Sequence, residues 1–263
     1  MYSTAMVLSD HVPSPPAFVR LAAHPLRWKL LTALADSDLR VRELVELVGE
    51  PQNLVSYHLR LLRDGGLVSA RRSSFDGRDS YHHLDLARCA DALAETGTAL
   101  HRALPRHDGA ASENASERPR HRAAVLFVCT GNSVRSPMAE ALLRHYAADH
   151  VRVTSAGTRP KRHLHPDMVR ILGDRFGIDV AGQQPRDLSS LARRRFDHVI
   201  TLCDKARETT PEFPHHPQRT HWSIPDPTTA SGTEQARQAA FERTVADIDT
   251  RIRHLLRVLT PAH

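Results

Sequence analysis

One stretch of the chain, residues 123–146, constrains the fold more than any other. It begins with a continuous apolar run over residues 123–128, as a strand buried on both faces of a parallel sheet requires. A short loop over residues 129–136 follows. Apolar residues at helical spacing come next: Met138, Ala141, Leu142 and Tyr146. A strand, a short loop and a helix in this order put the loop's backbone N–H groups at a helix N-terminus, which predicts an anion site.

Cys129 begins this loop and Arg135 ends it, with five residues between them. The spacing lets the loop curl so that its amides and the Arg135 guanidinium surround one tetrahedral oxyanion. The same field is expected to make Cys129 a thiolate nucleophile. Gly131 permits close backbone approach, and Asn132 and Ser136 are expected to hydrogen-bond across the loop. The predicted oxyanion-binding residues are Thr130, Gly131, Asn132, Ser133, Val134, Arg135 and Ser136.

Attack by Cys129 also requires an acid that protonates the departing oxygen. Asp226 is the candidate, because Pro225 and Pro227 on either side stiffen the loop that carries it. A Cys and an Arg six positions apart are a weak signal alone, and their place between a buried strand and a helix strengthens it. The alternative interpretations are an inert strand-end Cys129 and a plain Asp-Pro turn.

The rest of the chain divides around one segment. Residues 105–122 hold almost no large apolar side chains, which is linker composition. A length of 263 residues also suggests two domains. We therefore expect a disordered tail at 1–16, one domain at 17–104 and a second at 123–260.

Composition limits the expected binding partners and cellular compartment. The net charge of +6 fits a polyanionic partner, although only weakly. Three cysteines, an odd and sparse set, are not a disulfide framework and indicate a reducing compartment. The N-terminus shows no signal peptide, and no run of 18 apolar residues predicts a membrane span. We expect a cytoplasmic protein that contacts no membrane.

Three helices are predicted early in the chain, near residues 25–34, 40–48 and 52–64. The second and third are joined by a tight turn, and the third has a polar, basic outer face, as in a DNA-reading helix-turn-helix. The residues expected to face DNA on this helix are Gln52, Asn53, Ser56, Tyr57, Arg60 and Arg63. A helical interaction module with a solvated basic face is the alternative.

Two strands, near residues 67–72 and 79–84, come after this helix. The dipeptide Asp76-Gly77 between them favours a turn in an antiparallel hairpin, so the pair predicts a wing. The wing residues expected to meet phosphates or a minor groove are Arg71, Arg72 and Arg78. A closing helix is predicted over residues 86–104.

Residues 17–104 resemble the ArsR family of winged-helix repressors. The likeness is carried by residues 23–31, residues 53–68 and the wing. It implies a homodimer, formed through the first and last helices, that reads a double-stranded DNA operator. Members that sense metals use Cys pairs in the second helix, or Asp and His sets in the last. The second helix here has no Cys, and the last offers only Asp85, Cys89 and His101 without the usual spacing, so no metal site is expected.

Residues 123–258 resemble the low-molecular-weight tyrosine phosphatase family and its arsenate reductase branch. The likeness is carried by residues 128–140, the Ser-Ala-Gly-Thr, His-Pro and Phe-Gly-Ile-Asp motifs at 155–158, 165–166 and 176–179, and Asp226-Pro227. It implies an α/β domain with a four-stranded parallel sheet and helices on both faces. The strands are expected near 124–128, 151–154, 197–202 and 219–222. Together the two likenesses predict a mainly α winged helix-turn-helix followed by this α/β domain.

Phosphatase and reductase chemistry differ in the step after the first attack. In the reductase branch, a Cys at the place of Cys203 attacks Cys129, releases arsenite and leaves a disulfide. Phosphatases of the family usually carry another residue there and an aromatic residue after the Asp-Pro, where this chain has Thr228 and Thr229. Both features favour arsenate. A buried strand-end thiol is the alternative for Cys203.

Two positions depart from the reductase pattern. Thioredoxin-coupled reductases place a third Cys about seven residues after the second, where this chain has Thr210, and some have Cys at the position of Val134. We therefore expect no bound cofactor and an external reductant: mycothiol, glutathione with glutaredoxin, or thioredoxin. A role for Cys89 in the relay is not favoured.

The whole chain admits three hypotheses. The preferred one is a regulator fused to an arsenate reductase domain. The others are a regulator fused to a tyrosine phosphatase, and a repressor whose anion loop only senses an oxyanion. Coupling between the two halves is suggested by their fusion alone.

Overall fold

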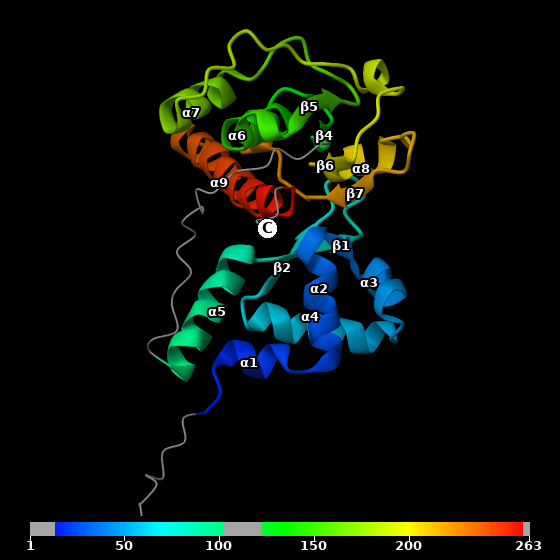
Figure 1. The fold of residues 1–263 in the computed structure, drawn as a ribbon, viewed down its shortest axis with the longest axis vertical. Coiled ribbons are helices and arrows are strands. Elements are labelled where there is room, and N and C mark those ends of the chain that lie inside the picture. Colours follow the sequence, from blue (N-terminus) through cyan, green and yellow to red (C-terminus); the bar gives the residue numbers. More distant parts are fainter. Residues whose placement is uncertain (1–13, 102–121, 260–263) are drawn as a thin grey trace, which may run out of the picture.

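The computed structural model describes residues 14–101 and 122–259 of the 263 (Figure 1). The described chain forms two halves, each with its own apolar core. The predicted linker, except Arg122, and the predicted tail, except residues 14–16, lie outside the described residues.

The N-terminal half is mainly helical, as predicted. Its elements are α1 (Ala17–Ala22), α2 (Pro25–Asp36), β1 (Leu39–Arg40), α3 (Val41–Val48), α4 (Gln52–Asp64), β2 (Val68–Arg72), β3 (Ser80–Leu84) and α5 (Leu86–Leu100). Pro25 opens α2, where its missing N–H would lack a helical partner in any case. Gly49 ends α3 in the left-handed conformation, with φ of 70°, which sets the tight turn before α4.

The strands of this half form a three-stranded antiparallel sheet in the order β1-β3-β2. Strands β2 and β3 pair from Val68 with Leu84 to Arg72 with Ser80, so the predicted hairpin is present. Its turn contains Gly77 with φ of 64°. The closing helix α5 ends at Leu100, before the predicted position 104, and residues 102–104 lie outside the described part.

The C-terminal half is an α/β domain. Its elements are β4 (Ala124–Cys129), α6 (Arg135–Ala147), the 3-10 turn η1 (Ala148–His150), β5 (Arg152–Gly157), α7 (Pro166–Phe176), the 3-10 turn η2 (Leu188–Leu191), β6 (His198–Thr201), α8 (Asp204–Thr209), β7 (Gln218–His221), the 3-10 turn η3 (Pro227–Thr229) and α9 (Glu234–Leu259). The four strands are parallel, in the order β5-β4-β6-β7. The predicted four-stranded parallel sheet is confirmed.

Strand β4 lies at the centre of the sheet, and all six of its residues are buried, as its unbroken apolar run predicts. Helices α6 and α9 pack against one another, and α7 packs on α9 (Figure 1). Helix α9, which is 26 residues long, was not among the predicted elements. It buries Phe241, Val245, Ile248 and Ile252, whose spacing is helical.

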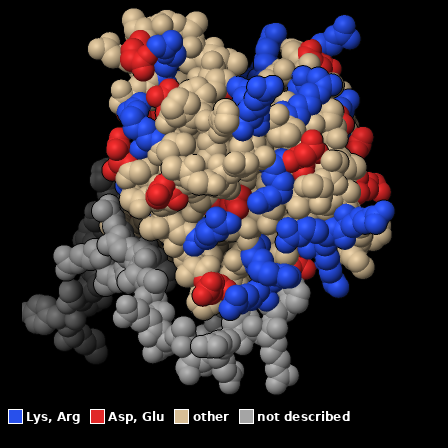
Figure 2. Space-filling view, turned by 90° about the horizontal axis from the view of Figure 1, so that it is seen from above, with Lys and Arg blue, Asp and Glu red and all other residues tan. Residues whose placement is uncertain are grey.

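The two halves meet where β1 lies near β7 and α8 (Figure 1), and Tyr81 of β3 donates to Glu208 of α8. Polar groups dominate this boundary. Figure 2, which views the molecule from the C-terminal half, shows Lys and Arg gathered along one side of that face. Basic side chains are therefore not confined to the predicted DNA-reading helix. Within the described ranges, no helix is long and apolar enough to cross a bilayer.

Candidate functional site

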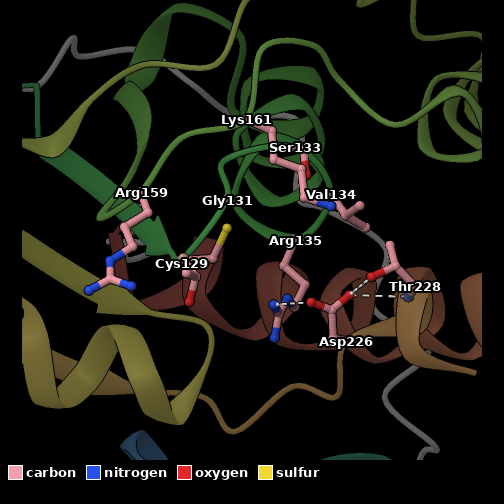
Figure 3. Close-up of a pocket in the computed structure, with 10 residues that line it drawn as sticks. Cys129, Gly131, Ser133, Val134, Arg135, Arg159, Lys161, Asp226 and Thr228 are labelled. Carbon is pink, nitrogen blue, oxygen red and sulfur yellow. Dashed lines mark hydrogen bonds and ion pairs between the residues drawn. The ribbon is translucent and has the colours of Figure 1, made fainter.

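The candidate site lies at the carboxyl end of β4, where the strand order reverses between β5 and β6. Open parallel sheets bind ligands at such a reversal, because the loops from neighbouring strands diverge there. Figure 3 shows Cys129 at this edge with its sulfur directed into a pocket. The pocket is lined by Cys129, Thr130, Gly131, Ser133, Val134, Arg135, Arg159, Lys161, Asp226 and Thr228.

The anion loop, residues 129–136, turns its carbonyls outward. The carbonyl oxygens of Cys129, Thr130, Gly131 and Ser133 accept hydrogen bonds from backbone N–H groups of the segment 158–165, at 2.8 to 3.1 Å. In a trans peptide the following N–H points the opposite way. The amides of residues 130, 131, 132 and 134 are thus directed away from that segment, as an anion site requires.

Two groups reach the Cys129 sulfur. The Asn132 N–H donates to it at 3.2 Å, and the Ser136 hydroxyl lies 3.0 Å from it. Asn132 holds this arrangement together: its side-chain amide donates to Ser136 Oγ at 2.9 Å and Ser155 Oγ at 2.8 Å. Its Oδ1 accepts the Arg186 N–H at 2.6 Å, and its φ is +44°. Hydrogen bonds to the sulfur stabilise a thiolate.

Arg135 and Asp226 lie side by side at one side of the pocket (Figure 3). Arg135 donates from Nη2 to Asp226 Oδ2 at 2.7 Å and from Nη1 to the Ile224 carbonyl at 3.0 Å. Its Nε is buried and donates to no group of the described residues. Thr228 donates to Asp226 Oδ1 from both its N–H and its hydroxyl. Burial alone would raise the pKa of Asp226, but the charge of Arg135 and the Thr228 bonds hold that pKa below its ordinary value.

Cys203 lies directly beside the anion loop. Its sulfur is 3.3 Å from Thr130 Oγ1, and the charges of Arg135 and Cys129 both act on its pKa, in opposite directions. Burial raises the pKa of Cys203, while the charge of Arg135 opposes that rise. The fold brings this thiol to the site because β4 and β6 are neighbours, so that their carboxyl ends meet at one edge.

Arg159, Lys161 and Thr228 line the pocket, although none of them was among the predicted site residues. Arg159 and Lys161 follow the Ser-Ala-Gly-Thr motif and are exposed at the pocket rim. That motif, together with the two cations that follow it, is the sequence signal that could have predicted these two pocket residues. Among the described residues that line the pocket, none is aromatic.

The residues predicted to face DNA on α4 are all exposed, while Val55, Leu59 and Leu62 on the opposite face are buried. Arg72 and Arg78 of the wing are exposed as well. Arg71 differs from them, because its guanidinium donates to the Ser223 carbonyl of the C-terminal half. Among described residues there is no cluster of three or more His, Cys, Asp and Glu that could hold a metal.

The fold and site define a cysteine-dependent oxyanion enzyme domain joined to a helix-turn-helix. The chain belongs to the low molecular weight phosphotyrosine protein phosphatase family, whose profile matches residues 124–262. Residues 24–70 match the profile of bacterial regulatory proteins of the arsR family.

Curated relatives refine the placement of the C-terminal half. The chain is 37% identical over 129 residues to an arsenate reductase of Bacillus subtilis, which is 49% of this chain and 91% of that protein. An arsenate reductase of Shouchella clausii matches at 37% over the same shares. A solved thioredoxin-dependent arsenate reductase of Corynebacterium glutamicum is 31% identical, with a TM-score of 0.43, over 52% of this chain and 61% of that one.

Proposed function

We propose that this protein is a DNA-binding regulator whose C-terminal half reduces arsenate to arsenite. Its functional domains are taken as residues 17–104 and 123–260. The observation that carries the proposal is the position of Cys203 beside the anion loop, with its sulfur 3.3 Å from Thr130 Oγ1. A second thiol has no task in phosphate-ester hydrolysis, whereas reduction of an oxyanion needs one.

In the first step the Cys129 thiolate attacks arsenic, and an arsenate oxygen departs as water after taking a proton from Asp226. The oxyanion is held by the loop amides and by Arg135, whose buried Nε lacks a partner within the described part of the chain. A bound dianion also competes with Asp226 for Arg135. Loss of that ion pair, and the nearby negative charge, raise the pKa of Asp226 and favour the protonated form that an acid requires.

In the second step the sulfur of Cys203, as thiolate, attacks the Cys129 sulfur. A sulfur–sulfur bond forms and the sulfur–arsenic bond breaks, and its electron pair stays on arsenic. Arsenic(V) becomes arsenic(III), arsenite leaves, and the two thiols are oxidised to a disulfide. Burial raises the pKa of Cys203 and opposes this thiolate, and the charge of Arg135 offsets part of that rise.

An external thiol then reduces the disulfide. Thr210 stands where thioredoxin-coupled reductases have a third Cys, and its hydroxyl donates to the Ala206 carbonyl at 2.6 Å. Cys89, in α5 of the N-terminal half, is not assigned this role: burial raises its pKa to about 11, and no cation among the described residues offsets the rise as Arg135 does for Cys203. The reductant is therefore taken to be mycothiol, glutathione with glutaredoxin, or thioredoxin.

The pocket favours a small anion over an aryl phosphate. Arg159 and Lys161 add two cations at its rim, and no described residue of the lining has an aromatic ring to stack on a phenyl group. A free oxyanion has no aryl group to accommodate and needs only the cationic lining, whereas an aryl phosphate must also place its ring.

The N-terminal half is proposed to bind a double-stranded operator as a homodimer. Helices α1 and α5 pack together and leave Val19, Leu93 and Leu100 exposed, at 37%, 55% and 80%. A partner copy would cover these apolar side chains. Sedimentation of the full chain tests the dimer, and Leu93→Glu should yield monomers. A wild-type monomer at micromolar concentration would contradict it.

The test of the enzymatic proposal is turnover of arsenate with each thiol donor, measured beside an aryl phosphate. Cys129→Ser and Cys203→Ser are the informative variants, and Cys89→Ser is the matched control for loss of a thiol. Arsenite production that both informative variants abolish, and the control retains, is the expected result.

Other outcomes redirect the assignment. Aryl phosphate hydrolysis lost only in Cys129→Ser, without arsenite production, makes the domain a phosphatase with a structural Cys203. Binding of arsenate without turnover of either substrate makes it an oxyanion sensor.

A further inference from the structure

The segment that carries Asp226 is held on two sides. We define residues 222–226, which join β7 to η3, as the acid loop. Toward the pocket, this loop supplies both partners of Arg135: the Ile224 carbonyl at 3.0 Å and Asp226 Oδ2 at 2.7 Å. The position of the acid loop therefore sets the position of the acid and of the oxyanion-binding guanidinium together.

On its other side, the acid loop meets the N-terminal half. Ser37 and Asp38 form a turn between α2 and β1, and this turn hydrogen-bonds to His221 and Ser223 of the C-terminal half. Ser37 Oγ accepts the His221 N–H at 2.9 Å, and the Asp38 N–H donates to the His221 carbonyl at 2.7 Å. Asp38 Oδ2 accepts the Ser223 N–H at 2.6 Å.

All three polar groups of buried Ser223 are engaged. Its N–H goes to Asp38, its carbonyl accepts from Arg71, and its hydroxyl donates to Asp204 Oδ1 at 2.7 Å. Asp204 is itself bound by the wing, because its Oδ2 accepts the Ser74 N–H at 2.6 Å. Each of these hydrogen bonds of Ser223 thus leads, directly or through Asp204, to the N-terminal half.

We call the contacts of Ser37, Asp38 and Arg71 with His221 and Ser223 the clamp. Charge and burial strengthen it. Asp38 is 2% exposed, and Arg251 of α9 donates to both its oxygens, at 3.0 and 3.3 Å. The Arg251 guanidinium lies 5.7 Å from the ring centroid of Trp222, the first residue of the acid loop. Charge-assisted bonds in a buried setting are stronger and better defined than surface ones.

We propose that Asp38, with Ser37 and Arg71, positions the acid loop, so that full activity of the Cys129 site requires the winged helix to be docked. This inference rests on the proposed role of Asp226. None of the three residues lines the pocket, so they act through Ser223 and His221 on the loop. A winged helix that was only linked to the enzyme domain, without these contacts, would not affect the position of the acid loop.

The test uses the full chain with Asp38→Asn, and with Ser37→Ala and Arg71→Gln as milder variants that each remove one hydrogen-bonding group. Glu208→Gln is the matched control: it removes the Arg40 ion pair, at 3.1 Å, between the same two halves and away from the acid loop. Arsenite production gives kcat and KM. Because the chain has two tryptophans, Trp28→Phe leaves Trp222 as the sole tryptophan, and excitation selective for tryptophan then reports on Trp222.

For Asp38→Asn we expect kcat/KM to fall about 10- to 100-fold, chiefly through kcat, since removal of a general acid itself costs about 10²–10⁴. Trp222 emission should move to longer wavelength as the loop loosens. The milder variants should move both readouts in the same direction by less, and Glu208→Gln should move neither.

Two results would overturn the proposal. One is a folded Asp38→Asn with wild-type kcat and Trp222 emission; if that variant does not fold, the same result in Ser37→Ala and Arg71→Gln decides. The other is an equal loss in Glu208→Gln, which would mean general docking rather than positioning. If neither arsenate nor an aryl phosphate is turned over, the enzymatic proposal fails separately, and Trp222 emission still tests the clamp.

Discussion

Gly157, the last residue of β5, allows the anion loop to approach the neighbouring strand closely. A Cβ at this position would lie 2.7 Å from the Thr130 carbonyl oxygen, 2.9 Å from the Asn132 nitrogen and 3.0 Å from Asn132 Cβ. Ordinary contacts begin at 3.4 Å, so the nearest atom alone must yield 0.7 Å (3.4 minus 2.7). Two of these three atoms are backbone, and Asn132 also donates to the Cys129 sulfur. Gly157→Ala therefore cannot be relieved by a rotamer change.

The expected cost comes from that displacement. Overpacking of this kind destabilises by about 1–3 kcal/mol. At roughly 2–4 °C per kcal/mol, the melting temperature should fall by about 2–12 °C. A shift of about 1 Å in a catalytic group can cost about 100-fold in rate, so kcat/KM for arsenate should fall by about 10- to 100-fold.

The assay is thermal unfolding together with turnover, and the control is Gly173→Ala. Gly173 is an exposed residue inside α7, and its added Cβ would meet nothing within 4 Å. That change should stabilise by about 0.5–1 kcal/mol through helix propensity and leave turnover unchanged. A Gly157→Ala protein with wild-type melting temperature and turnover would refute the reasoning.

Three further predictions concern pH, redox chemistry and DNA. His82 is buried, and its burial, with Arg63 and His83 nearby, lowers its pKa to about 4. Since the folded state disfavours the protonated imidazole, the free energy of unfolding is highest above about pH 6.5 and falls by about 2 kcal/mol by pH 5. In urea unfolding, His82→Gln should lose less of this free energy between about pH 6.5 and pH 5 than the wild type. An equal loss in both proteins would contradict the lowered pKa of His82. Thr210→Cys places a thiol seven residues after Cys203 and should raise arsenite production with thioredoxin relative to that with mycothiol. An unchanged ratio of the two rates would mean that a thiol at position 210 cannot take over the disulfide from Cys203. Arg60→Ala should weaken operator binding and reduce the slope of log K against log salt by about 0.9, measured by fluorescence anisotropy, whereas an unchanged slope would remove Arg60 from the phosphate contacts.

Much of the fold could be predicted from local pattern. The apolar run at 124–128 predicted a buried central strand, and strand β4 has all six residues buried. Helical spacing predicted α4 and its buried face, and Asp76-Gly77 predicted the hairpin turn. Each of these signals lies within a dozen residues, where side-chain periodicity and turn chemistry act directly. Helix α9 was not among the predicted elements, although its buried apolar residues have helical spacing.

The sequence by itself determined the chemistry that the chain can attempt: a Cys and an Arg bracketing a loop between a strand and a helix, a candidate acid, and a second thiol. The tertiary structure decided which distant groups serve them. Asn132 meets Ser155 and Arg186, Arg159 and Lys161 line the pocket, and Asp38 binds Ser223 from 185 positions away. Arg71, expected at DNA, is bound to Ser223. Contacts across such separations leave no periodic trace in the sequence, because they arise only when the two halves dock and buried polar groups find partners.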